Sequence, residues 1–293
     1  MCYQAGVVSP VYTAQVTVRH DELDRFGRVH PAVYLRYLAH TAVEASTAAG
    51  YAAAWYAAAG AMWLVRRSTF DLADPARAEE RLAIRTWVED FRRVRSHRRY
   101  AVHGGDGRLC VDALTDWVYV DAASGRPRRV PADLEAAFGV VVGSGRERES
   151  WDAPPPPAAP ALGSHRVRAC EVDTIGHVNN AVYLDLATQA TLDVLEDAGW
   201  PLERMIDGGA VPVLRHADLE YLESARYGDR LEITTWFGAA EDRLQAHQRI
   251  VRQGGERPLV RVATRWQWTD PMGEAPAEPP GELLSALRPL LAA

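Results

Sequence analysis

The 293-residue chain contains no lysine, so all 33 of its basic residues are arginines. This absence excludes catalysis through a lysine Schiff base. Cysteine is scarce as well, and Cys2, Cys110 and Cys170 are scattered without a CxxC pair. A disulfide framework or a structural zinc site is therefore a poor fit, and we expect the three thiols to act as small buried apolar groups.

Long apolar segments and excess positive charge are also missing. No stretch approaches the roughly 18 apolar residues of a membrane span. Residues 1–4 lack the basic start of a signal peptide. We therefore expect a cytoplasmic protein with no membrane partner. The net charge is −6, whereas nucleic-acid-binding proteins are usually basic, so we expect no nucleic-acid partner.

What the sequence does contain is a duplicated segment. Residues 24–35 and 173–184 share an aspartate, a glycine three positions later and a final Ala-Val-Tyr-Leu. The offset is 149 residues, and it also pairs flanking turns, tryptophans and C-terminal segments without an obvious gap. Agreement over so many elements indicates a duplicated domain. We assign residues 1–139 to the first domain, residues 140–163 to a Pro- and Gly-rich linker, and residues 164–293 to the second domain.

The two halves differ in charge. Residues 1–150 carry 20 arginines against 18 acidic residues, and residues 151–293 carry 13 against 21. The resulting net charges of +2 and −8 suggest different roles on one scaffold.

Each half is predicted to contain one long helix between a first strand and four later strands. In the first half the helix spans about residues 32–49 and ends at Gly50, and the strands cover residues 11–19, 61–70, 81–91, 94–103 and 109–120. Such a helix is buried most simply across one face of an antiparallel sheet. The fold class is therefore α+β, and two copies favour an intrachain pseudo-dimer over a solenoid.

The second copy predicts a strand–turn–helix junction that places the Asp173 carboxylate beside the N-terminus of a helix. Exposed backbone N–H groups at such an end suit a developing anion. A carboxylate facing an oxyanion site is the arrangement that acyl transfer needs. Asp173 could instead only cap its helix, but the surrounding motif favours catalysis.

The Gly-His-Val-Asn-Asn-x-x-Tyr-Leu sequence at residues 176–184 resembles the 4-hydroxybenzoyl-CoA and acyl-ACP thioesterase branch of the hotdog fold. Two fused copies resemble the acyl-ACP thioesterases of plants and bacteria, which are tandem hotdogs. The resemblance implies two domains in which an antiparallel sheet wraps a long helix. It also implies a hydrolase that converts an acyl-ACP or acyl-CoA thioester to free acid and thiol without a cofactor.

The same resemblance assigns roles to three residues of the second copy. Asp173 takes the place of the catalytic aspartate, as nucleophile or general base. His177 matches a histidine of the acyl-ACP thioesterases and is expected to assist by positioning. The backbone N–H of Asn180 matches the oxyanion donor. Two family positions differ here: Ile175 replaces an asparagine, and Thr188 and Ala39 replace a glutamate.

The first copy lacks part of this set. Pro31 stands where the second copy has Asn180, and proline has no N–H. Arg28 and His30 likewise replace His177 and Asn179. We therefore expect the principal site in the second half, with Asp24 a relic or a weak second site.

Four further residues are candidates for binding substrate or carrier protein. Asn179 is one, although its side chain is expected mainly to shape and cap the turn. Arg92, Arg93 and Arg95 belong to a dense basic cluster with Arg98 and Arg99. The cluster could be a charged, solvated strand edge or a docking patch for CoA phosphates or an acidic carrier protein. The 149-residue offset pairs Arg92 and Arg93 with Glu241 and Asp242, which favours docking slightly.

Two other functions remain open from the sequence. A hotdog hydratase or dehydratase also acts on acyl thioesters, and a non-catalytic acyl-binding or carrier-binding module needs no catalytic aspartate. The histidines show no metal-ligand spacing, so we expect no metal site. Further assembly into a homo-oligomer of pseudo-dimers is also open.

Overall fold

The computed structural model describes residues 10–141, 153–238, 243–273 and 275–292. The chain divides into two compact units, Met1–Glu149 and Ser150–Ala293. The second unit's first strand, β6 (Ala161–Arg166), begins inside the segment predicted to be a linker. Residues 161–163 belong to the domain because they pair with β8 (Arg230–Gly238) in an antiparallel ladder. Residues 142–152 of that segment lie outside the described residues.

The first unit has one long helix, α1, on a five-stranded antiparallel sheet, with two shorter helices, α2 and α3. The strands lie in the order β1-β3-β4-β5-β2. The elements are β1 (Val11–Thr17), the 3-10 turn η1 (His20–Glu22), α1 (Pro31–Ala48), α2 (Ala53–Ala59), β2 (Ala61–Leu72), β3 (Arg81–Arg92), β4 (Arg95–His103), β5 (Leu109–Asp121) and α3 (Ala132–Phe138).

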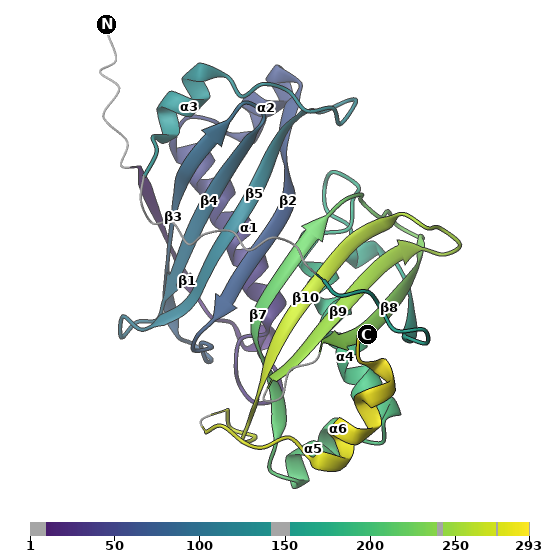
Figure 1. Cartoon of the computed structure of the whole chain (residues 1–293). Helices are drawn as coiled ribbons and strands as arrows, with labels where there is room; N and C mark the ends of the chain where they lie inside the picture. Colours follow the sequence, from purple (N-terminus) through teal and green to yellow (C-terminus); the bar gives the residue numbers. More distant parts are fainter. Residues whose placement is uncertain (1–9, 142–152, 239–242, 274, 293) are drawn as a thin grey trace, which may run out of the picture. The chain divides into compact units, whose positions relative to one another are not determined.

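The second unit repeats this arrangement, with strand order β6-β8-β9-β10-β7. Beside β6 and β8 it contains η2 (Ala169–Glu171), α4 (Asn180–Asp197), α5 (Leu202–Asp207), β7 (Val211–Tyr221), β9 (Arg243–Arg252), β10 (Pro258–Thr269), α6 (Gly281–Leu287) and η3 (Arg288–Leu290). The prediction of two α+β units, each with a long helix across an antiparallel sheet, is confirmed (Figure 1).

Helix α1 shows why the central helix packs on its sheet. Tyr34, Leu38, Ala42 and Ala45 are buried and recur every three or four residues, so they share one face of the helix. The chain leaves the helix through Gly50, whose φ of +93° favours glycine. Helix α4 repeats the pattern with Tyr183, Ala187, Ala190 and Val194.

One buried tyrosine fixes the start of each central helix. The N–H of Ala76 donates to the Tyr34 hydroxyl at 2.8 Å, and the N–H of Ala225 donates to the Tyr183 hydroxyl at 3.0 Å. Burial raises the pKa of both phenols, so they stay neutral. Both tyrosines are thus core anchors.

The constant 149-residue offset fails at strand β9. Val88 faces Arg98, and Arg98 faces Thr115. In the second unit Phe237 faces Ala246, and Ala246 faces Thr264. Along the sequence, Ala246 follows Phe237 by one residue fewer than Arg98 follows Val88. It precedes Thr264 by one residue more than Arg98 precedes Thr115.

The two one-residue changes cancel, so the offset is again 149 residues after β9. Within β9, however, the offset is 148 residues, and the prediction of a repeat without an obvious gap was wrong there. Arg98 therefore corresponds in space to Ala246 and not to His247. Because side chains alternate along a strand, His247 lies on the opposite face.

Two smaller expectations can also be compared with the structure. Cys110 is buried as predicted, but Cys170 is exposed, because it lies in the short turn η2. In the described part of the chain, no helix is both long and apolar enough to cross a membrane.

Candidate functional site

The Asp173 carboxylate lies in a tight turn that joins η2 to α4. Its Oδ1 atom accepts hydrogen bonds from the N–H groups of Ile175 at 2.9 Å and His177 at 3.3 Å. The backbone closes the same turn, since the Asp173 N–H donates to the His177 carbonyl at 2.8 Å. Gly176 permits this turn because its φ is +83°. The carboxylate is therefore held in place before any ligand arrives.

The second oxygen of this carboxylate has a different environment. Among the described residues, no hydrogen bond or ion pair involves Asp173 Oδ2. One oxygen thus ties the loop, and the other is free to accept a proton or attack a carbonyl carbon.

Helix α4 begins directly after this turn, at Asn180. Asn179 is its N-cap, and its side-chain oxygen accepts the Ala181 N–H at 3.0 Å. In the described part of the chain, the Asn180 N–H has no hydrogen-bond acceptor. An open N–H in the first turn of an 18-residue helix carries partial positive charge. It suits a tetrahedral oxyanion.

His177 contributes to the turn through its backbone. Its N–H and carbonyl both bond to Asp173. Within the described ranges its imidazole makes no hydrogen bond. The structure thus brings Asp173, His177 and Asn180 into one loop of eight residues.

Glu171 supports this loop, although it was not among the residues predicted from the sequence. Its carbonyl accepts the Asn179 N–H at 2.9 Å, and its carboxylate contacts His165 Nε2 at 2.8 Å. The matching Glu22 in the first unit accepts the Arg19 N–H at 2.8 Å and bonds to the Tyr37 hydroxyl. The glutamate two residues before each aspartate was the available signal.

The first unit has the same turn with a different chemical setting. Asp24 Oδ1 accepts the N–H groups of Phe26 at 2.8 Å and Arg28 at 3.0 Å. Its Oδ2, however, pairs with Arg28 Nε at 3.1 Å. Pro31 is the first residue of α1 and has no N–H to donate. In the first unit the second carboxylate oxygen is thus occupied by Arg28, and the N–H at the start of the helix is absent.

The basic cluster is split by the β3–β4 hairpin. Arg92 and Arg93 are exposed at the turn, and Arg92 pairs with Asp90 at 2.9 Å. The Arg95 guanidinium bonds to the buried carboxylate of Asp116. Arg95 is held by a fully buried carboxylate, whereas Arg92 pairs with a carboxylate that is itself partly exposed, so Arg92 and Arg93 are the more exposed candidates for carrier binding. Glu241 and Asp242 lie outside the described residues.

Arg98 and Arg99 do not belong to a surface patch. They are 7% and 5% exposed and point to opposite faces of β4. Arg99 pairs with Glu89 at 2.5 Å and Asp112 at 3.1 Å, whereas Arg98 points toward α1. The sequence signal that separates them is the alternation of Arg98 with Tyr100 and Val102, both fully buried.

No metal centre forms in the described ranges, since no three His, Cys, Asp or Glu side chains come together there.

Family models match both halves of the chain. Residues 9–138 match the model of the acyl-ACP thioesterase N-terminal domain, and residues 167–287 match that of the thioesterase-like superfamily. No curated protein matches the chain.

Solved structures match nearly the whole chain at low identity. A structure described as an oleoyl thioesterase of Lactobacillus plantarum has 20% identity and a TM-score of 0.73, covering 87% of this chain and 95% of that one. An acyl-ACP thioesterase of Bacteroides thetaiotaomicron has 18% identity and a TM-score of 0.70, with coverages of 88% and 98%. The 12:0-ACP thioesterase of Umbellularia californica has 14% identity and a TM-score of 0.69, covering 89% of this chain and 95% of that one. These likenesses show that the fold is a tandem hotdog.

Proposed function

The chain belongs to the thioesterase families whose models match its two halves, and we propose that it hydrolyses acyl thioesters at one principal site in the second half. The match of the first half to the acyl-ACP thioesterase N-terminal domain supports an acyl-ACP substrate, with acyl-CoA as the alternative carrier. The observation that carries the site assignment is the contrast between the two turns. Within the part of the chain that the structure describes, only the second turn has both a carboxylate oxygen without a partner and a helix N–H without an acceptor.

The proposed reaction uses the two atoms at the start of α4. The thioester carbonyl oxygen accepts the Asn180 N–H, which stabilises the negative charge that develops on that oxygen. Asp173 Oδ2 either removes a proton from the attacking water or attacks the carbonyl carbon itself, forming an anhydride that water then hydrolyses. In both routes the carbon–sulfur bond breaks, the thiol leaves with a proton, and the acid is released.

His177 and Asn179 act in this proposal by positioning. The His177 N–H holds Asp173 Oδ1, and the Asn179 cap fixes the first turn of α4. Arg92 and Arg93 are retained as a proposed contact for an acidic carrier protein, because they are exposed on one hairpin.

The test is thiol release from a panel of acyl-ACP and acyl-CoA thioesters, followed with a thiol-reactive dye. Wild type, Asp173→Ala and Asp24→Ala are compared on the best substrate. We expect Asp173→Ala to lose about 10³-fold or more of kcat/KM, as when a nucleophile or base is removed. Asp24→Ala should stay within about threefold of wild type.

Full activity of Asp173→Ala would contradict the site assignment. Loss of enoyl absorbance without thiol release would indicate a hydratase instead. Tight acyl-CoA binding without turnover, unchanged in Asp173→Asn, would indicate a non-catalytic binding module.

A further inference from the structure

Two neighbouring segments of the second unit carry four exposed arginines. One segment runs from the end of β6 to the start of η2, and the other is the loop that leads from β7 into β8. Backbone hydrogen bonds join them at Val167, whose N–H donates to the Asp229 carbonyl at 2.9 Å and whose carbonyl accepts the Gly228 N–H at 3.1 Å. We call the four exposed arginines the basic rim, and they are Arg166, Arg168, Arg226 and Arg230.

The basic rim lies beside the Asp173 turn. The loop that carries Arg226 contacts this turn directly, since the Val178 N–H donates to the Ala225 carbonyl at 2.9 Å. The segment that carries Arg168 leads into the same turn through η2. Rim and turn belong to one unit, so their arrangement does not depend on where the first unit lies.

The rim is also remote from the gaps in the described chain next to β6 and β8. Arg166 and Arg230 form the last pair at one end of the β6–β8 ladder. The described chain adjoins its gaps near Pro154 and at Gly238, at the other end of β8, where Trp236 Nε1 donates to the Pro154 carbonyl at 3.0 Å.

The pairing of Arg166 with Arg230 is unfavourable for the sheet. Like charges directly opposite each other on neighbouring strands are destabilising. Glu232 lies two positions further along β8, and within the described residues it forms no ion pair with either arginine. The first unit avoids this contact, because Thr17 faces Arg81 there. The fold therefore does not need an arginine at position 166.

Arg19, the first-unit counterpart of Arg168, is held by carboxylates. Its guanidinium contacts Asp21 at 3.5 Å and Glu22 at 3.0 Å. In the second unit Cys170 stands at the position of Asp21, so the first of these contacts is missing.

The second contact is missing because Glu171, which corresponds to Glu22, has another partner. Its carboxylate contacts His165 Nε2 at 2.8 Å, and Val16 stands at that position in the first unit. In the part of the chain that the structure describes, no carboxylate forms an ion pair with Arg168. Its guanidinium is thus available to a partner outside the chain.

The local charge of the two segments runs against the charge of their own half. Residues 166–171 and 225–230 hold four arginines and two acidic residues, although the second half carries a net charge of −8. The corresponding residues 17–22 and 76–81 hold three arginines and four acidic residues, in a half with a net charge of +2. A positive patch kept beside one turn of an otherwise acidic half points to a negatively charged partner.

An exposed aromatic ring lies within the rim. Tyr227 is 67% exposed and follows Arg226, whereas the first unit has Ala78 at this position. Arginine and tyrosine are enriched at protein interfaces and often dominate their binding energy. Small-molecule sites, in contrast, are concave and mostly apolar, so exposed arginines spread over two surface segments fit a protein partner better than a nucleotide.

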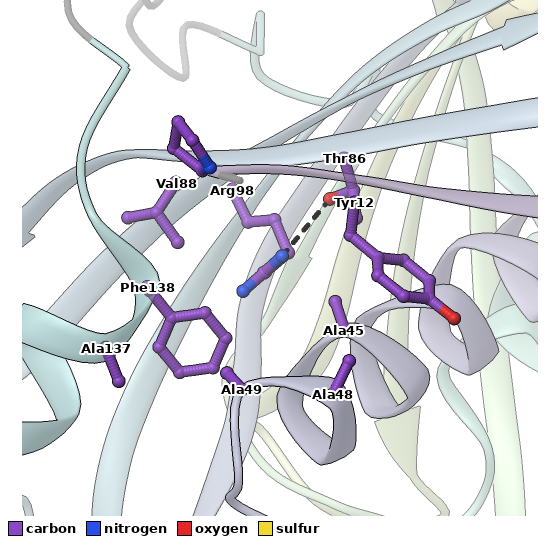
Figure 2. Close-up of a pocket in the computed structure, with 10 residues that line it drawn as sticks. Tyr12, Ala45, Ala48, Ala49, Thr86, Val88, Arg98, Ala137 and Phe138 are labelled. Atoms are coloured by element: carbon purple, nitrogen blue, oxygen red, sulfur yellow. Dashed lines mark hydrogen bonds between the residues drawn. The ribbon is translucent and has the colours of Figure 1, made fainter. Parts of the chain in front are cut away.

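Exposure separates the rim from Arg98 of the first unit. Arg98 is 7% exposed, its Nη1 donates to the Thr86 hydroxyl at 3.3 Å, and its guanidinium carbon lies 5.1 Å from the centre of the Phe138 ring (Figure 2). The cavity beside Arg98 measures about 20 Å³, which is room for one or two water molecules at roughly 10–15 Å³ each. A partner protein can contact the rim but not Arg98.

We propose that the basic rim is the docking surface for the acidic carrier protein that delivers the acyl thioester to the Asp173 turn. This inference rests on the proposed thioesterase function and locates its partner. Guanidinium groups bind carboxylates through paired hydrogen bonds, and a positive patch beside the reacting carboxylate also speeds the encounter with an acidic protein. Arg92 and Arg93 lie in the other unit, so their contribution can be measured separately.

The first experiment measures docking without using activity. A purified bacterial acyl carrier protein in its holo form, with the phosphopantetheine arm but no acyl group, is titrated into wild type and variants. The rim variant combines Arg166→Thr, which copies the first unit, with Arg226→Gln and Arg230→Gln. The matched control combines Arg77→Gln with Arg81→Gln, because these exposed arginines hold the positions of Arg226 and Arg230 in the first unit.

At low salt the rim variant should bind the carrier protein about tenfold or more weakly than wild type, and the control should stay within about twofold. The difference should shrink as salt rises to about 0.15 M, because salt screens exposed charges. Wild-type affinity in the rim variant, or equal losses in rim variant and control, would overturn the proposal.

Thermal unfolding separates docking from a role in the sheet. Arg166→Thr removes the like-charge contact with Arg230, so its melting temperature should equal or exceed that of wild type. A lower melting temperature together with unchanged affinity for the carrier protein would show that Arg166 only protects the strand edge, and would overturn its part in docking.

The second experiment compares one acyl group on three carriers, which are the carrier protein, CoA and the small thiol N-acetylcysteamine. In the rim variant the kcat/KM ratio of acyl carrier protein to N-acetylcysteamine thioester should fall about tenfold or more, mainly through KM. The matching ratio for CoA should change less than about threefold. An equal fall for CoA would show that the rim binds nucleotide phosphates and would overturn the assignment to a carrier protein.

The two experiments also separate this inference from the proposed function. If wild type hydrolyses no thioester, the proposed function fails, and the titration with holo carrier protein still decides whether the rim is a docking surface. If wild type hydrolyses the acyl carrier protein and the rim variant keeps the wild-type KM, the docking surface is wrong and the thioesterase function stands.

Discussion

The two aspartate turns have the same backbone but different chemistry. In both, Oδ1 accepts two N–H groups of its own loop, so this contact builds the turn and does not distinguish an active carboxylate. The difference lies in what surrounds it. Arg28 pairs with the second oxygen of Asp24, and Pro31 removes the helix N–H, whereas His177 and Asn180 leave both available. Under the proposed mechanism, the residues that distinguish the two turns are Arg28 against His177 and Pro31 against Asn180.

The largest expected effect comes from giving the second unit the proline of the first. Asn180→Pro removes the proposed oxyanion donor and should lower kcat about 10²- to 10³-fold. The helix should remain, because proline fits the first turn of a helix, as Pro31 does in α1. Thiol-release kinetics measure the loss, and circular dichroism checks the helix.

The matched control for this substitution is Pro31→Asn, which restores an N–H in the first unit. Its kcat should stay within about threefold of wild type, because Arg28 still occupies Asp24. Equal losses for both variants would show that the two turns contribute equally.

A smaller effect concerns strand positions on the opposite face of the sheets. Arg99 and His247 correspond, since each faces a tryptophan, Trp87 or Trp236. Arg99 has carboxylate partners, whereas both nitrogens of His247 are buried without a hydrogen bond in the described chain. Burial lowers the pKa of His247 to about 4, against 6.5 normally.

The low pKa of His247 makes stability depend on pH. Between pH 6.5 and 4 the unfolded chain binds a proton that the folded chain does not, so acid favours unfolding there. The free energy of unfolding should fall by about 1 kcal/mol per pH unit from this group, and the contribution is complete above pH 6.5.

His247→Phe should remove this contribution while keeping a ring on Trp236, which the imidazole stacks on at 5.6 Å. Urea unfolding of wild type and variant at pH 7, 6, 5 and 4.5 gives the difference at each pH. Parallel curves for the two proteins would mean that His247 titrates normally in the folded state.

The smallest expected effect comes from transferring the ion pair. In His177→Arg, a guanidinium should bind Asp173 Oδ2 as Arg28 binds Asp24, which makes the carboxylate a weaker base. We expect a loss of roughly tenfold in kcat/KM, with thiol release as the measurement.

Arg28→His is the reciprocal control for this exchange and should not change the rate. A His177→Arg enzyme as fast as wild type would place the reacting oxygen out of reach of residue 177.

Much of the fold could be predicted from the sequence because local signals agreed. The apolar spacing and Gly50 predicted a helix at residues 32–49, and α1 spans Pro31–Ala48. The turn residues between strands predicted β3 and β5 to within a residue or two. The candidate site was predictable in outline, since Asp173, His177 and Asn180 are close in sequence and necessarily share one turn.

What the sequence could not provide was strand register and pairing. The Asp24–Arg28 ion pair depends on how the loop folds back, and Arg98 looked like part of a surface cluster because Arg92 and Arg93 precede it. The slip of β9 was hidden because two one-residue changes cancel along the chain. Register depends on hairpin geometry that composition does not reveal.

The slip of β9 also suggests how a duplicated gene acquires a new interior. A strand that slips by one residue against both of its neighbours exchanges all its inward and outward side chains at once, without any change in its own sequence. The buried Arg98 of β4 and the buried Ala246 of β9 then represent the two faces of a single ancestral strand. Reconstructed ancestors of each half, with β4 and β9 in either register, would trace when the two interiors diverged.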